Sequence, residues 1–138
     1  TVLMLGGGPE LRSRTFRVFH LRNSAKFLSS VRDWALEELP KLGCLPGILA
    51  LGVGRTHYEA CVELIKAMAK GDLNQQSPQE KRLTEEINEK GIGPLSLGGE
   101  TTLLGSFIGV GPLRASGARI VSMRPYCCYE PRRAMVEF

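Results

Sequence analysis

An apolar run that turns directly into a helix constrains the fold of this chain most. Residues 48–53 are apolar apart from Gly52, and Gly54 follows them. A short apolar run bounded by glycine is typical of a buried strand. Thr56 with Glu59 three residues later is a capping box, in which the hydroxyl binds the amide of residue 59 and the carboxylate reaches back. The pattern indicates an α/β fold, and the expected buried stripe of the helix is Cys61, Leu64, Ile65 and Met68.

The rest of the pattern predicts one domain with a mixed sheet and about three main helices. The chain has 138 residues, enough for a single domain with a modest core. Further strands are expected over residues 2–5, 15–19, 103–110 and 118–123. Helices are expected from Asn23 or Ser24 to about Leu39, from Thr56 to about Lys70, and from Ser77 to Gly91.

Composition argues against several classes of protein. The net charge of +4 comes from scattered basic residues without interleaved aromatics, so nucleic acid is not an expected partner. No run approaches the ~20 apolar residues of a membrane span, and the first five residues are too short for a signal peptide. We therefore expect a cytoplasmic protein, or one of an organellar matrix, without membrane contact. In such a protein the four cysteines are expected to be free thiols or metal ligands, not disulfides.

Two separated cysteine segments point to metal chemistry. Cys44 opens Cys-Leu-Pro-Gly just before the apolar strand, and Cys128 lies four residues ahead of Arg132. Thiolates beside glycine turns are the soft donors that iron–sulfur clusters need. Each cysteine could instead be a small apolar residue in a turn, and Cys61 is expected to be inert in the core beneath its helix.

The order of the short motifs resembles the catalytic domain of class I fumarases and L-tartrate dehydratases. The motifs are Leu5-Gly6-Gly7-Gly8, Cys44-Leu45-Pro46-Gly47, Leu51-Gly52-Val53-Gly54, Gly91-Ile92-Gly93-Pro94, Leu97-Gly98-Gly99-Glu100-Thr101-Thr102 and the segment from Cys128 to Arg132. The resemblance covers nearly the whole chain but only the later half of that family's first domain. It implies that residues 1–138 are a fragment of the class I fumarase N-terminal domain, without the upstream half and the swivelling second domain.

The resemblance also implies a cofactor, a substrate and partners. It implies a 4Fe-4S cluster with Cys44 and Cys128 as ligands, and a third cysteine that is missing from this chain. Gly7 and Gly8 are expected to bind the substrate, a small dicarboxylate such as fumarate, malate or tartrate. A beta-type subunit or second domain, in a homo- or hetero-oligomer, would supply the catalytic residues, which stay unknown here. Ser116 stands where the family has a histidine.

Two functions remain open at this stage. The first is a part of an iron–sulfur hydro-lyase that is inactive on its own, and the second is a degenerate or truncated scaffold of the same family without cluster or catalysis. The first requires the sulfurs of Cys44 and Cys128 to come within about 7 Å of each other. It also leads us to expect that the amides of Gly54 and Arg55, at a helix N-terminus, face the Cys44 turn and bind an anion there.

Overall fold

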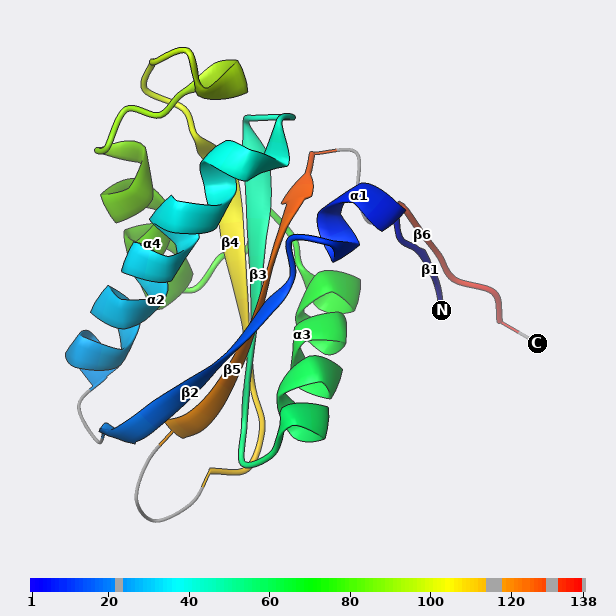
Figure 1. Cartoon of the computed structure of the whole chain (residues 1–138). Coiled ribbons are helices and arrows are strands. Elements are labelled where there is room, and N and C mark those ends of the chain that lie inside the picture. The colour runs from blue at the N-terminus through cyan, green and yellow to red at the C-terminus, as the bar shows by residue number, and fades with distance from the viewer. Residues whose placement is uncertain (22–23, 114–117, 129–131, 138) are drawn as a thin grey trace.

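The chain folds around a four-stranded mixed sheet in a computed structural model (Figure 1). The structure describes residues 1–21, 24–113, 118–128 and 132–137. In sheet order the strands are β2 (Arg14–Leu21), β5 (Ala118–Cys127), β3 (Gly47–Gly54) and β4 (Leu103–Val110). Strand β3 runs parallel to β4 and antiparallel to β5, and β5 is antiparallel to β2. The predicted mixed α/β sheet is confirmed.

Three main helices cover the two faces of this sheet, as predicted. Helices α2 (Ser24–Glu38) and α4 (Pro78–Asn88) lie on one face, and α3 (His57–Lys70) lies on the other (Figure 1). Val31, Leu49 and Leu83 belong to the core on the α2 and α4 side, whereas Ile48 and Leu64 belong to the core under α3. Among the described helices, none is long and apolar enough to cross a bilayer.

Helix α3 packs unusually close to the sheet because the strands beneath it carry glycines. A Cβ at Gly52 would lie 2.0 Å from the Ala60 carbonyl oxygen, and one at Gly109 would lie 2.3 Å from the Glu63 carbonyl oxygen. Close packing of strand against helix therefore explains the Gly52 and Gly54 pair. The buried stripe of α3 consists of Ala60, Leu64, Ala67 and Met68.

This stripe corrects part of the predicted one. Cys61 and Ile65 are exposed, although both were expected to be buried. The physical reason is the close approach at the glycines, which turns the small residues Ala60 and Ala67 toward the sheet. Cys61 is carried to the side of the helix, where its Sγ lies 3.3 Å from the Ser122 hydroxyl of β5.

The helix starts follow the predicted capping chemistry with one difference. Thr56 Oγ1 accepts a hydrogen bond from the Glu59 amide at 3.2 Å, as predicted. The Glu59 carboxylate, however, accepts from the Arg55 amide at 2.9 Å, one residue earlier than in a capping box. At α4 the box is complete, since Ser77 and Glu80 cap each other reciprocally.

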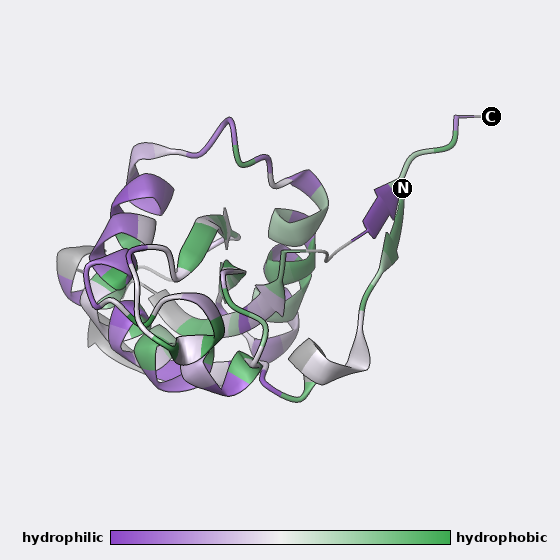
Figure 2. Ribbon diagram, turned by 90° about the horizontal axis from the view of Figure 1, so that it is seen from above, coloured by the Kyte–Doolittle hydropathy of each residue, from purple (hydrophilic) through white to green (hydrophobic). Residues whose placement is uncertain are grey.

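The two ends of the described chain form a separate two-stranded ribbon. Strand β1 (Val2–Met4) pairs antiparallel with β6 (Arg132–Ala134), and Figure 2 shows this ribbon projecting from the body of the molecule. The short helix α1 (Gly7–Glu10) follows β1 and contains Gly7 and Gly8. Two 3-10 helices, η1 (Leu39–Leu42) and η2 (Pro94–Ser96), lie in the connections around the Cys44 turn.

Candidate metal and substrate site

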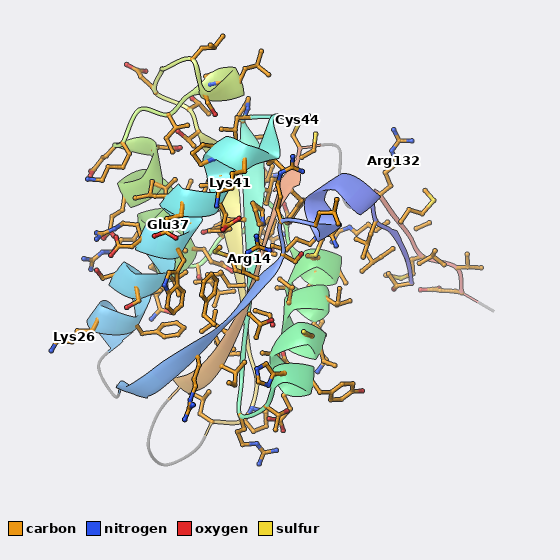
Figure 3. All side chains as sticks on the ribbon, viewed as in Figure 1. Arg14, Lys26, Glu37, Lys41, Cys44 and Arg132 are labelled. Carbon is orange, nitrogen blue, oxygen red and sulfur yellow. The ribbon has the colours of Figure 1, made fainter. Side chains whose placement is uncertain are left out.

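The pairing of β3 with β5 brings the two cysteine segments to one edge of the sheet. Gly47, the first residue of β3, lies opposite Cys127, the last residue of β5. Cys44 precedes β3 by three positions and Cys128 follows β5 by one, so both lie beyond the same ends of these paired strands. Figure 3 shows Cys44 at this edge.

The Cys128 thiol is influenced by two other thiols. Partial desolvation of the thiol raises the pKa of Cys128 above its ordinary value, although the residue as a whole is exposed, and Cys127 raises it further through its charge and a side-chain hydrogen bond. Cys44 adds a smaller electrostatic contribution in the same direction. An approach of the Cys44 and Cys128 sulfurs to within about 7 Å stays a prediction. No disulfide joins them, because all four cysteines are free thiols.

The donor set fits part of a cluster site. Thiolates are the ligands that iron–sulfur clusters use, and Cys44 and Cys128 are both exposed at the edge. Within the described ranges, no three His, Cys, Asp or Glu side chains come together as a metal-binding group. Cys61 does not complete the set. It contacts Ser122, which lies five residues before Cys127 along β5, or about 17 Å at the usual rise of a strand.

Basic side chains gather between α2, β2 and the Cys44 turn. Glu38 is buried to all but 6% and its Oε1 lies 3.0 Å from Lys41 Nζ and 3.5 Å from Arg14 Nε. Arg12 donates to the carbonyl oxygens of Lys41 and Gly8. The Glu38 carboxylate thus faces two cations, Lys41 and Arg14, which Figure 3 labels together with Cys44.

The predicted glycines lie close to this basic group. Gly7 and Gly8 are exposed and form the first turn of α1. The preceding carbonyl, that of Gly6, accepts a hydrogen bond at 3.1 Å from Arg124, a buried side chain of β5. The glycine segment is therefore held over the end of β5. A role of Gly7 and Gly8 in substrate binding stays a prediction.

The prediction of a second anion site, at the amides of Gly54 and Arg55, is wrong. Because β3 begins after the Cys44 turn and ends at Gly54, the start of α3 lies about 23 Å from that turn. The Arg55 amide is also occupied by the Glu59 carboxylate at 2.9 Å. The Gly54 and Arg55 amides therefore do not face the cysteines. Ser116, which stands at the family's histidine position, lies outside the described residues.

Two features beside the cysteines were not visible from the sequence. The loop that carries η2 reaches the Cys44 turn, where the Leu95 amide donates to the Leu45 carbonyl at 3.3 Å. A cavity of about 190 Å³ lies next to Cys128. Its lining combines apolar and polar surface and includes Ile48, Met68, Phe107, Tyr126 and Arg133. Local patterns carry no information on such contacts between distant segments.

Comparison with protein families decides the identity of the fold. The family model described as fumarate hydratase (Fumerase) matches residues 1–137. The chain belongs to the class I fumarate hydratase family. Membership makes this fumarase chain a hydro-lyase subunit of the fumarate hydratase type. A comparison with curated proteins gives no match.

Proposed function

We propose that the fumarase chain forms part of an iron–sulfur hydro-lyase that reversibly adds water to, or removes it from, a dicarboxylate such as fumarate/malate or tartrate. The observation that carries the proposal is that Cys44 and Cys128 lie beyond the same ends of the paired strands β3 and β5 within a fumarate hydratase domain. These two thiolates would hold a 4Fe-4S cluster. When bound, such a cluster supplies a Lewis-acidic iron that assists the departure of hydroxide.

The chain's own residues have distinct parts in this function. Cys44 and Cys128 hold the metal, and the cations Arg12, half-buried, and Lys41, exposed, attract a substrate with two negative charges. The first-turn amides of Gly7 and Gly8 would orient one carboxylate.

Other parts of the site come from elsewhere in this proposal. The third cluster ligand and the catalytic groups would be supplied by further sequence and by a beta-type subunit or second domain, in a homo- or hetero-oligomer. The free state of all four cysteines supports a cytoplasmic location.

A second candidate function is a scaffold of the same family without cluster or catalysis. The observation that favours it is that the described residues supply no group of three metal ligands. The two functions differ in one measurable property, the capacity of Cys44 and Cys128 to retain iron.

Anaerobic reconstitution separates the two functions. The protein and its Cys44→Ser and Cys128→Ser variants are incubated with ferrous iron, sulfide and a small dithiol that can supply a further ligand, then desalted. Cys61→Ser is the matched control, because its thiol is exposed but far from the sheet edge. Iron, sulfide and the electron paramagnetic resonance spectrum are measured.

The hydro-lyase proposal expects about four irons per chain in the native sequence and in Cys61→Ser, and a loss of most of that iron in the other two variants. Equally low iron in all four proteins would overturn the proposal that the chain holds a cluster, and would favour the non-catalytic scaffold. Equal and high iron in all four would show that Cys44 and Cys128 are not its ligands.

A further inference from the structure

The two glycine motifs that follow α4 are joined by a buried threonine. Thr102 is fully buried, and its Oγ1 accepts a hydrogen bond from the Gly93 amide at 3.1 Å. Its main-chain carbonyl accepts from the Gly47 amide at 3.0 Å. Gly47 is the last residue of the Cys-Leu-Pro-Gly turn, so Thr102 contacts the η2 loop through its side chain and the cysteine turn through its backbone.

Asn88 fixes the position of Thr102. The Asn88 Oδ1 accepts from the amides of Thr102 and Leu103 at 2.9 and 2.8 Å, and its Nδ2 donates to the Leu103 carbonyl at 3.0 Å. The end of α4 therefore holds the start of β4 by three hydrogen bonds. Since each of these groups is partly buried, hydrogen bonds to water would not fully replace the three bonds if they were lost.

The η2 loop connects Thr102 to the other side of the cysteine turn. Its base is closed by the Gly98 amide, which donates to the Ile92 carbonyl at 2.8 Å. Its tip carries two consecutive non-glycine residues in the left-handed region, Leu95 at φ 52° and Ser96 at φ 59°. Such backbone persists only where the surroundings enforce it. At this tip the Leu95 amide donates a hydrogen bond to the Leu45 carbonyl at 3.3 Å.

The Cys44 turn is thus held from two directions. Gly47 is bound to the Thr102 carbonyl, and Leu45 is bound to a loop whose base is fixed by the Thr102 hydroxyl. Cys44 itself is exposed, so its own packing does not fix the direction of its thiol. The hydrogen bonds of Leu45 and Gly47 are the restraint.

We propose that Thr102 is a positioning residue that sets the direction of the Cys44 thiol through the η2 loop. This inference rests on the proposed function where it concerns iron, because it assumes that Cys44 is a ligand. Removing the hydroxyl leaves the Gly93 amide without its acceptor and weakens the restraint that holds the loop against Leu45. The Cys44 turn then samples more conformations, which raises the reactivity of the free thiol and weakens its retention of a metal.

The test compares variants of nearly equal size. Thr102→Val removes the hydroxyl, Thr102→Ser keeps it, and Thr101→Val is the matched control at the exposed neighbouring position. The first readout is the rate at which iodoacetamide alkylates Cys44 in the metal-free protein. Peptide mass spectrometry measures it relative to Cys61, which lies on α3 and far from the loop. The second readout is iron retained after reconstitution.

In Thr102→Val, we expect iodoacetamide to alkylate Cys44 at least about threefold faster than in the native protein, with each rate taken relative to that of Cys61. We also expect this variant to retain less iron. Thr102→Ser and Thr101→Val should match the native protein in both readouts. A folded Thr102→Val protein with an unchanged ratio overturns the positioning role, and iron uptake by the native protein would leave the proposed function standing. A raised ratio without iron uptake by any protein supports the positioning of Cys44 and overturns its role as a ligand.

Hydrogen exchange on the native protein keeps the inference testable if Thr102→Val does not fold. The amides of Gly93 and Leu95 should both be protected, and their protection should be lost together as denaturant is added, because one restraint holds both. Exchange of the Leu95 amide at the rate of a free peptide would overturn the inference.

Discussion

Replacing Gly52 by alanine tests how closely α3 lies on the sheet. The added Cβ would lie 2.0 Å from the Ala60 carbonyl oxygen and 2.2 Å from the Leu64 amide nitrogen. Ordinary contacts begin at 3.4 Å, so α3 must retreat by roughly 1 Å or more. Both neighbours are helix backbone and cannot rotate away. The whole helix therefore moves, or the strand does.

The cost follows from the side chains under the helix. A gap of that width removes about a quarter to a half of the dispersion energy of the atoms that face it. Leu64 and Met68 are buried, and such side chains contribute about 1.5–3 kcal/mol each. With strain of about 1–3 kcal/mol, the free energy of unfolding should fall by about 2–6 kcal/mol. That is a large share of the stability of a small domain.

Urea unfolding measures this change through the fluorescence of Trp34, the only tryptophan, which stacks on Phe16 with ring centroids 4.0 Å apart. Gly7→Ala is the matched control, because a Cβ there meets no atom within 4 Å. If the free energies of unfolding of Gly52→Ala and Gly7→Ala differ by less than about 0.5 kcal/mol, the close approach of α3 is refuted.

Three further predictions concern the start of α3 and the activity of the chain. Thr56→Ala should lower the free energy of unfolding by about 1 kcal/mol through the lost cap, and Thr101→Ala, at an exposed loop position, should change it little; equal effects would argue against the cap. The pKa of Glu59 is lowered, chiefly by the hydrogen bond that its carboxylate accepts from Arg55. The ionised Glu59 therefore stabilises the fold above the ordinary pKa of 4.5, and this stabilisation is lost as the pH falls through the lowered pKa. Glu59→Gln should therefore flatten the acid limb of a stability-against-pH curve, and an unchanged limb would contradict this. After reconstitution the 138 residues alone should show no measurable fumarate hydration in an absorbance assay, since the described part supplies no complete ligand group; turnover would show that the assigned roles are wrong.

Local patterns predicted the elements around the site well. The apolar run before Gly54, the capping residues Thr56 and Ser77, and the strand Leu103–Val110 are found where the sequence indicates them. Each depends on nearest neighbours in the chain, such as a hydroxyl three residues before a carboxylate. The family motifs similarly gave the fold and the hydro-lyase type.

Contacts between distant segments were not predictable in the same way. Which side of α3 faces the sheet depends on Gly52 and Gly109 in other strands, so the placement of Cys61 was wrong. The direction of β3 decides that the start of α3 lies far from Cys44, and a single sequence does not give that direction relative to a site. The contact of Leu95 with Leu45 likewise depends on how the η2 loop folds back.

The order of strands in the sheet has a consequence for how this protein is made. Strand β3 lies between β4 and β5, both of which follow it in the chain, and β2 pairs only with β5. A ribosome therefore releases β2 and β3 before their partner exists, and both wait for the C-terminal part of the chain. Cys44 emerges early and remains in an unfinished sheet until β5 pairs with β3. Cys44 and Cys128 thus come to the same end of the sheet only after β5 has paired with β3, and a metal that needs both can bind only then.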